Sequence, residues 1–465
     1  MQQGYRMKPT PTIAIFDIGK TNKKLFLFDE NYQIVWEKTA NLPETTDEDG
    51  DVCEDVALLT AWVKEAFAEA QQVTNFEIKA LNFSTYGASF VHVNADGEPV
   101  APLYNYLKPY DEALQKQFYD TYGGEKNFAV AAASPILGNL NSGMQIYRLK
   151  YEKPELFQQI KYSLHLPQYI SSIFTKQFYS DITSIGCHTN LWDFSKKQYH
   201  EWVKKEAVLP KLPEINSTLN IPHSAFRIGI GLHDSSSALI PYLINFHVGG
   251  IPQPFILLST GTWCISINPF NDTPLTYEEL QYDCLCFLTY QAKPVKASRL
   301  FAGYEHEAQT KRLATHFGVP DGYYKTVLFD PQLIDALRAN SEPIADGDRF
   351  TLLKNSPFVN RDLAKFGSYE EAYHQFILDL ITQQLISTEL VLHNSPVRRI
   401  FVDGGFSKNP IFMNLLANAF PEVEVFAASV AQASALGAAL VMHDTWNTKP
   451  LRNDLIDLKY YAHIR

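Results

Sequence analysis

The chain has 465 residues, of which 46% are hydrophobic and 20% charged, and its formal net charge at pH 7 is −11. This composition is typical of globular proteins and excludes a disordered, fibrous or membrane-embedded chain. The length exceeds what one hydrophobic core usually fills, so it predicts two domains. The negative charge, without any basic stretch, disfavours nucleic acid or an anionic lipid surface as a partner.

The cysteines and the N-terminal segment indicate a cytoplasmic protein. The five cysteines are odd in number and form no CxxC pair, which argues against a disulfide framework or a structural zinc site. The segment MQQGYRMKPTPT has no apolar stretch of signal-peptide length, and the chain has no run of about 18 apolar residues. We therefore expect a reducing cytoplasmic environment and no membrane insertion.

The first predicted element is a hairpin, IAIFDIGKTNKKLFLFD, with apolar strands on both sides of a polar turn. Its turn contains Asp17, Gly19, Lys20 and Thr21. Glycine lets backbone N–H groups approach phosphate oxygens, and a carboxylate can hold magnesium through water. A DxG turn is also common in hairpins without any ligand. This turn is therefore a candidate phosphate site that a second motif must support.

A second hairpin, FILLSTGTWCISINPF, repeats the pattern of apolar strand, small polar turn and strand. Gly261 lies at the same step of this turn as Gly19 in the first. Thr260 and Thr262 supply hydroxyl and amide groups but no carboxylate, so the two turns could hold opposite sides of a triphosphate around one metal ion. The alternative is a threonine-rich hairpin stabilised by cross-strand contacts. The repetition predicts two similar halves.

The segments around the hairpins mix helices with strands. An amphipathic helix is predicted from Val56, a short strand at IKALNFS, and the strongest helix from Tyr369. The segment 246–254, rich in glycine and proline, is the expected hinge. The chain is therefore predicted to be an α/β protein with domains at 1–245 and 246–465.

Two further segments of the second half could contribute to the nucleotide site. VDGGFSKN is predicted to leave a strand, turn at Gly404 and Gly405, and open a helix, a geometry suited to a nucleotide. The alternative is an ordinary corner between a strand and a helix. The later segment AQASALGAALV is predicted to be a helix of small residues, which indicates close helix packing more than ligand contact.

The segment GIGLHDSSSALIPYL holds the candidate catalytic base. It lacks the third glycine of GxGxxG, so a Rossmann dehydrogenase is disfavoured. Asp234 precedes a helical run, where the commonest role of aspartate is that of an N-cap. A carboxylate just before the hinge would also face an interdomain cleft and could take a proton from a sugar hydroxyl. We expect His233 to contact substrate at most.

These four segments, in this order and spacing, resemble the FGGY carbohydrate kinases of the actin, Hsp70 and sugar-kinase superfamily. The resemblance implies an α/β fold of two similar ribonuclease H-like (actin-like ATPase) domains with an interdomain cleft. Residues 1–245 would form the sugar side and residues 246–465 the ATP-binding side. The implied enzyme is a phosphotransferase that uses ATP and Mg²⁺ to phosphorylate a hydroxyl of a small sugar.

The resemblance also implies site residues. Asp234 would be the catalytic base, and Asp17 would bind the metal through water. Lys20 stands where the family usually has a small hydroxyl residue. The implied ATP-binding residues are Asp17, Gly19, Lys20, Thr21, Lys24, Thr260, Gly261, Thr262, Gly404, Gly405 and Asn409. The implied sugar-binding residues are Gly87, His233 and Asp234.

One departure from the family pattern bears on the substrate. The family's Lys-x-x-Trp appears here as QIYR at 145–148, ahead of KPELF, which looks more like the rhamnulokinase and fuculokinase branch. The expected substrate is a ketose such as L-rhamnulose or L-fuculose. The alternatives are a nucleotide-driven interaction protein like actin or Hsp70, or a catalytically silent sugar-sensing regulator. The sequence leaves open the phosphorylated hydroxyl, a homodimer, and the role of the region after Cys286.

Overall fold

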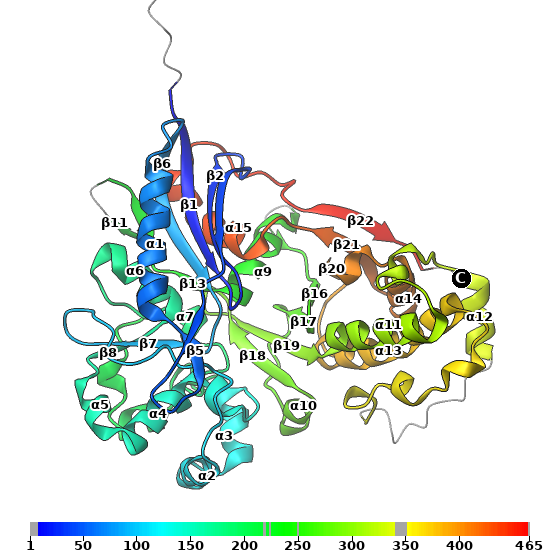
Figure 1. Cartoon of the computed structure of the whole chain (residues 1–465), viewed down its shortest axis with the longest axis horizontal. Coiled ribbons are helices and arrows are strands. Elements are labelled where there is room, and N and C mark those ends of the chain that lie inside the picture. Colours follow the sequence, from blue (N-terminus) through cyan, green and yellow to red (C-terminus); the bar gives the residue numbers. More distant parts are fainter. Residues whose placement is uncertain (1–7, 217–219, 223–224, 249–250, 340–350, 464–465) are drawn as a thin grey trace, which may run out of the picture. The chain divides into compact units, whose positions relative to one another are not determined.

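The computed structural model describes residues 8–216, 220–222, 225–248, 251–339 and 351–463 (Figure 1). By their contacts, the described residues form two compact units. The first lies within Met1–His247, Cys286–Lys293 and Ala431–Leu455, and the second within Val248–Leu285, Pro294–Val430 and Ile456–Arg465. No helix among the described residues has both the length and the apolarity that a membrane crossing requires.

The first unit is built on a seven-stranded sheet. Five of its strands are β1 (Thr10–Ile18), β2 (Lys23–Asp29), β3 (Ile34–Ala40), β6 (Phe76–Thr85) and β12 (Arg227–Gly229). β11 (Asn220–Pro222) extends the order to β11-β12-β6-β1-β2-β3, and β13 (Leu232–His233) pairs with β6. The small strand pairs are β4 (Glu44–Thr46) with β5 (Val52–Glu54), β7 (Phe90–Val93) with β8 (Tyr162–His165), and β9 (Trp192–Asp193) with β10 (Gln198–Tyr199).

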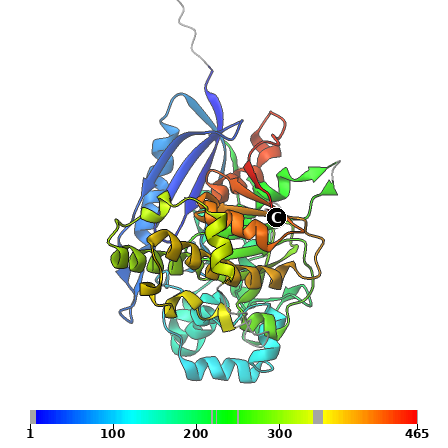
Figure 2. The same cartoon turned by 90° about the vertical axis from the view of Figure 1, so that its right-hand side faces the viewer.

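Helices cover both faces of this sheet. The helices are α1 (Val56–Gln71), α2 (Glu112–Thr121), α3 (Glu125–Ala132), α4 (Ser142–Glu152), α5 (Pro154–Gln159), α6 (Leu166–Thr175), α7 (Ile182–Ile185), α8 (Glu201–Lys205), α9 (Asp234–Asn245), α15 (Ala433–Leu440) and α16 (His443–Trp446). α1 and α6 pack on one face through a buried core that includes Phe16 and Phe83. Figure 2 shows the N-terminal strands, in blue, beside α1. α9 and α15 lie side by side and contact β6 (Figure 1).

The second unit contains another seven-stranded sheet. Its strands are β16 (Ile256–Thr260), β17 (Cys264–Asn268), β18 (Cys284–Leu288), β19 (Pro294–Leu300), β20 (Arg399–Gly404), β21 (Glu424–Ser429) and β22 (Asp457–Tyr461), in the order β18-β19-β17-β16-β20-β21-β22. Its helices are α10 (Tyr277–Gln281), α11 (Ala302–Phe317), α12 (Pro331–Ala339), α13 (Tyr369–Leu392) and α14 (Pro410–Ala419). The predicted long helix from Tyr369 is α13, which is buried along most of its length.

The two sheets share one topology, which confirms the predicted repeat. In the first, β1 pairs antiparallel with β2, β2 with β3, and β1 parallel with β6. In the second, β16 pairs antiparallel with β17, β17 with β19, and β16 parallel with β20. Both turns are closed from the glycine: Gly19 N donates to Asn22 O and Gly261 N to Trp263 O, each at 2.9 Å. The predicted class, two similar ribonuclease H-like α/β domains, is therefore correct.

The structure divides the chain differently from the sequence-based boundary at 245/246. Residues 286–293, which include the last three residues of β18, and residues 431–455 belong to the first unit, although the sequence-based boundary places them in the second domain. The reason is tertiary packing, since α15 lies against α9, β1 and β6. The expected hinge at 246–254 includes residues 249 and 250, which lie outside the described residues. Around them, β14 (His247–Val248) pairs with β15 (Ile251–Pro252).

Candidate active site

Asp17 and Asp234 lie at the same edge of the first sheet. β1 and β13 both run parallel to β6, and in register Asp17 and Leu232 are each paired with Ser84. Asp234 follows two residues after Leu232, so both carboxylates project from the carboxyl ends of strands, where ligands of α/β proteins usually bind. Asp234 is the first residue of α9, and His233, rather than Asp234, is the N-cap.

The pKa values of both carboxyl groups are raised towards neutrality. Burial raises the pKa of Asp17 to about 6; the Ser434 hydroxyl, which donates to Oδ2 at 3.0 Å, opposes the rise, and the negative charge of Asp234 adds to it. Burial also raises the pKa of Asp234 to about 6, against the N–H of Ser235, which donates to Oδ1 at 2.6 Å. A carboxylate of this pKa is suited to accept a proton at neutral pH.

The three predicted sugar-side residues lie together. His233 Nε2 is 3.2 Å from Asp234 Oδ1, and burial lowers the pKa of His233 to about 4, so the imidazole is neutral at pH 7 and the contact is not an ion pair at that pH. A Cβ atom on Gly87 would lie 2.6 Å from His233 Nε2, so only glycine lets the ring approach the backbone there. Since 38% of the Asp234 side chain is exposed, a ligand can reach this group.

The first turn presents its tip to solvent. Thr21 is exposed, and Lys24 lies opposite Asp17 in the hairpin, with Nζ 3.3 Å from Gln432 Oε1. Lys20 Nζ donates to Glu44 Oε1 at 3.0 Å and lies 3.6 Å from Glu54 Oε1. The Lys20 ammonium therefore contacts two carboxylates of the β4–β5 hairpin, and its backbone stays in the turn that is the candidate phosphate site.

The sequence analysis missed Lys23. Only 2% of this residue is exposed, and its Nζ donates to Gly19 O at 3.1 Å, Lys20 O at 2.8 Å and Glu54 Oε1 at 3.0 Å. The period of the strand could have revealed that Lys23 is buried. Lys23 and the buried Leu25 are two positions apart, so they lie on the same side of the strand. The buried Lys23 ammonium thus stabilises the first turn by linking two of its carbonyl groups to Glu54.

The small-residue helix α15 packs closely, as predicted, and also reaches the site. A Cβ atom on Gly437 would lie 1.8 Å from Ser237 O, so α9 and α15 pack backbone to backbone. This approach brings Ser434 to Asp17 and Gln432 to Lys24. No local signal could have predicted these contacts, because the partners are more than 400 positions apart in the chain.

In the second unit, the structure joins the two predicted nucleotide motifs. Thr260 Oγ1 donates to Asp403 O at 2.5 Å and accepts from Phe406 N at 3.0 Å, and Thr260 O accepts from Gly405 N at 2.8 Å. Gly404 has a φ of 93°, and a Cβ atom there would lie 2.0 Å from Thr260 O. The Thr260 hydroxyl therefore holds the two turns together, and the exposed Thr262 and Gly261 remain open to a ligand.

The start of α11 supports the second turn. The sequence did not predict this contact. A Cβ atom on Gly303 would lie 1.8 Å from Gly261 O, and Tyr304 N donates to Thr262 O at 3.1 Å. The glycine at 303 thus lets the helix rest directly on the turn.

These elements enclose a cavity of about 630 Å³, a size suited to a small ligand. It is lined by Thr260, Gly261, Gly303, His306, Tyr324, Lys325, Gly405, Phe406, Lys408, Asn409 and Pro410. Asn409 Oδ1 caps α14, and its Nδ2 donates to the Tyr373 hydroxyl, which lies 2.9 Å from His306 Nε2. Burial lowers the pKa of His306 to about 4. No sequence motif marks His306 or Tyr324 as site residues.

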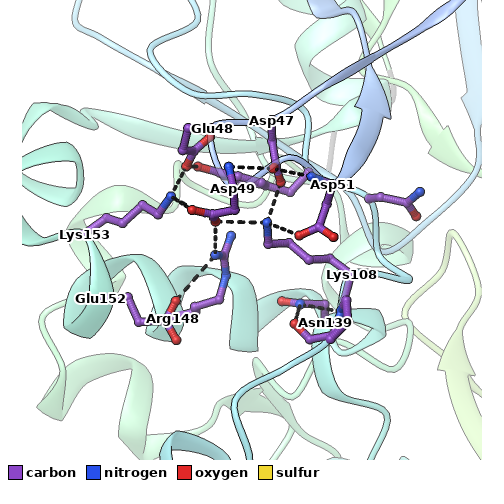
Figure 3. Close-up of polar contacts among 12 residues, drawn as sticks. Asp47, Glu48, Asp49, Asp51, Lys108, Asn139, Arg148, Glu152 and Lys153 are labelled. Carbon is purple, nitrogen blue, oxygen red and sulfur yellow. Dashed lines mark hydrogen bonds and ion pairs between the residues drawn. The ribbon is translucent and has the colours of Figure 1, made fainter.

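An ion cluster fixes the loop that joins β4 to β5 (Figure 3). The buried Lys108 ammonium lies 2.6 Å from Asp47 Oδ2, 3.0 Å from Asp49 Oδ2 and 2.6 Å from Asp51 Oδ2. These carboxylates surround one cation, so the cluster ties the loop to the segment that holds Lys108. The loop leads into β5, whose last residue is Glu54, the partner of Lys23.

The donor set of the first unit fits magnesium better than a transition metal. The described residues contain no group of three or more histidine, cysteine, aspartate or glutamate side chains arranged to hold a metal ion. Magnesium usually binds through one or two carboxylates together with water and substrate phosphates. Asp17, with Asp234 nearby, offers that kind of site.

Comparison with known proteins identifies the family. The N-terminal domain of the FGGY family of carbohydrate kinases matches residues 12–225, and its C-terminal domain matches residues 373–443. A rhamnulokinase of Halalkalibacterium halodurans is 21% identical over 281 residues, which cover 56% of this chain and 56% of that protein. The chain thus matches about half the length of this curated relative.

Solved structures show the same fold. A carbohydrate kinase from Novosphingobium aromaticivorans has a TM-score of 0.78 and 20% identity, over 98% of this chain and 95% of that one. A ligand-bound xylulose kinase from Lactobacillus acidophilus has a TM-score of 0.74 and 17% identity, over 98% and 94%. The two domain matches together cover more than half of the sequence, and the chain belongs to the FGGY family of carbohydrate kinases.

Proposed function

We propose that the chain is a kinase that transfers the γ-phosphoryl group of ATP, with Mg²⁺, to a hydroxyl of a small sugar. The observation that carries the proposal is the placement of Asp17 and Asp234 at one sheet edge, both with pKa values near 6. Phosphoryl transfer to an alcohol needs one carboxylate to accept the hydroxyl proton and another to hold a magnesium–phosphate complex.

In this proposal Asp234 is the general base. Its Oδ1 is oriented by the N–H of Ser235 and by His233, and it accepts the proton of the sugar hydroxyl as that oxygen attacks the γ-phosphorus. Gly87 and His233 contact the sugar. Asp17 binds magnesium through water, and the bound metal ion neutralises charge on the phosphates.

The phosphates would be bound mostly by backbone groups. Gly19, Lys20, Thr21 and Lys24 serve in the first turn, and Thr260, Gly261 and Thr262 in the second. Gly405 and Asn409 line the cavity of the second unit, which we assign to the nucleotide, and Gly404 directly precedes Gly405 in the same turn. Backbone N–H groups at such turns bind phosphate without needing a positive side chain.

We further propose a 6-deoxyketose, L-rhamnulose or L-fuculose, as the acceptor. Support comes from the QIYR and KPELF segments and from the matched rhamnulokinase of Halalkalibacterium halodurans. The reaction would take place in the cytoplasm, where the five cysteines, all buried, would stay reduced. The expected partner is the small-molecule sugar.

The test is ADP release from the purified protein with ATP and Mg²⁺ against a panel of ketoses, polyols and aldoses. Asp234→Asn should lower turnover by about 10² to 10⁴ while ATP binding is retained. Asp120→Asn, which removes an exposed carboxylate of α2, is the control. ATP consumption that depends on a peptide would favour an actin- or Hsp70-like protein, and sugar binding without turnover would favour a regulator. Full activity of Asp234→Asn would refute the assignment of the base.

A further inference from the structure

The first turn has an internal cation that the proposed mechanism does not use. Lys23 is 2% exposed and lies in β2, directly after the turn. Its three hydrogen bonds satisfy the ammonium completely: two go to the carbonyl oxygens of Gly19 and Lys20, and one goes to Glu54. A buried lysine without such partners would be strongly destabilising.

The two carbonyl contacts of Lys23 also determine the direction of the N–H groups that follow those carbonyls in the chain. In a trans peptide the C=O and the following N–H point in opposite directions, and the chain has no cis peptide among its described residues. When Lys23 draws the Gly19 and Lys20 carbonyls inward, it turns the N–H groups of Lys20 and Thr21 outward. Within the described residues, neither N–H donates a hydrogen bond.

We propose that Lys23 is a positioning residue for the nucleotide phosphates: by holding the Gly19 and Lys20 carbonyls, it aims the N–H groups of Lys20 and Thr21 at a phosphate oxygen. Successive outward N–H groups form an anion-binding concavity. The inference deepens the proposed function and rests on it, because it requires that a phosphate of ATP bind at this turn.

Glu54 also contributes to the position of the first turn, because its carboxylate contacts both lysine side chains. Its Oε1 accepts from Lys23 at 3.0 Å and lies 3.6 Å from Lys20 Nζ, and only 6% of the residue is exposed. Both lysine side chains are therefore directed towards the carboxylate and away from the exposed tip of the turn. The consequence is that the turn would bind phosphate through backbone groups, while the Lys20 side chain anchors the turn to β5.

The experiment compares Lys23→Met with Lys38→Met. Lys38 is a lysine of β3 in the same sheet, paired with Glu69 on the surface. Equilibrium binding of Mg–ATP and of adenosine is measured by calorimetry for both variants and for the natural chain. We expect Lys23→Met to bind Mg–ATP about 10- to 100-fold more weakly, as for the loss of one or two hydrogen bonds to a charged group. Adenosine, which has no phosphate, should bind with unchanged affinity.

A second variant controls for misfolding, because Lys23→Met removes the nearer cation from the buried Glu54 and leaves it with the Lys20 ammonium at 3.6 Å. Lys23→Met/Glu54→Gln removes that charge and should show the same selective loss of Mg–ATP affinity. The proposal is overturned when a folded variant keeps full Mg–ATP affinity, or when it loses Mg–ATP and adenosine affinity equally. A natural chain that binds neither compound would refute the proposed function itself, so the two failures are distinguishable.

Discussion

The hydroxyl of Ser434 donates a hydrogen bond of 3.0 Å to Asp17 Oδ2, across 417 positions of the chain. This bond favours the ionised carboxylate and so opposes the effect of burial on the pKa of Asp17. A small helix residue that contacts neither sugar nor nucleotide in our proposal thereby affects the charge of the metal-binding group.

Ser434→Ala should raise the pKa of Asp17 above its present value of about 6. At pH 6.5 a larger fraction of Asp17 would then be protonated, so the apparent affinity for Mg²⁺ should fall several-fold. The loss should largely disappear at pH 8. Mg²⁺ titrations of turnover at the two pH values would measure it. Ser237→Ala is the control, because that hydroxyl donates to the Ser434 carbonyl and not to a carboxylate. A loss independent of pH would contradict the explanation.

The rate of the reaction should fall at acid pH. Asp234 accepts a proton in the proposed mechanism, so it must be ionised, and burial raises its pKa to about 6. We expect kcat/KM for the sugar to be constant above pH 7 and to decrease below about pH 6, by about tenfold per pH unit when Asp234 alone must be ionised and by up to about 100-fold when Asp17 must be ionised as well. Asp17 titrates in the same range, so the profile reports the pair. Activity that is level down to pH 4.5 would exclude Asp234 as the base.

Asp234→Asn should stabilise the protein at neutral pH. The folded pKa of about 6 lies above the ordinary 3.8, so the folded state binds protons more tightly than the unfolded state. The contribution of this group to stability is therefore fully present below pH 3.8 and is lost as pH rises through about 6. Removing the charge should raise Tm by a few degrees at pH 7.5 and have little effect at pH 4. Calorimetry at both pH values would test it.

The acidic loop should depend on Lys108 for its stability (Figure 3). The side chain of Asp47 is completely buried against the Lys108 ammonium, so Lys108→Met would leave a buried charge unpaired. We expect the free energy of unfolding to fall by roughly 3–5 kcal/mol. Lys116→Met, which breaks an exposed pair with Asp120, should leave the free energy of unfolding nearly unchanged. Urea denaturation of both variants gives the comparison; equal effects would contradict it.

Local patterns predicted the two hairpins and their turns. Gly19 and Gly261 occupy the same step of two turns because short apolar runs form the strands on each side, and these runs are visible in the sequence. The strand period, which puts Lys23 on the same side as Leu25, could have identified Lys23 as buried. The strand-to-helix position of Asp234 was also predictable, although the N-cap proved to be His233.

Tertiary contacts account for what the sequence did not predict. Ser434 and Gln432 reach the first turn because α15 packs on α9, and nothing near those residues encodes the partner. The side-chain contacts of Thr260 and Lys20 were missed for a related reason. The Thr260 hydroxyl bonds to a carbonyl of β20, and the Lys20 ammonium bonds to a carboxylate of β4, and both partners are distant in the sequence. His306 lies in a segment without a motif, and only the folded cavity identifies it.

The position of α15 has a consequence for the synthesis of the protein. Asn82 Nδ2 donates to Ala438 O, so a buried amide of β6 depends on a helix made near the end of translation. When the first 247 residues have been synthesised, the strands of the first unit and α9 are present, but α15, which packs beside α9 and on β1 and β6, is not. The part of the sheet that α15 covers stays exposed to solvent and to chaperones until residues 431–455 emerge. A fragment ending at residue 247 should therefore aggregate rather than fold on its own.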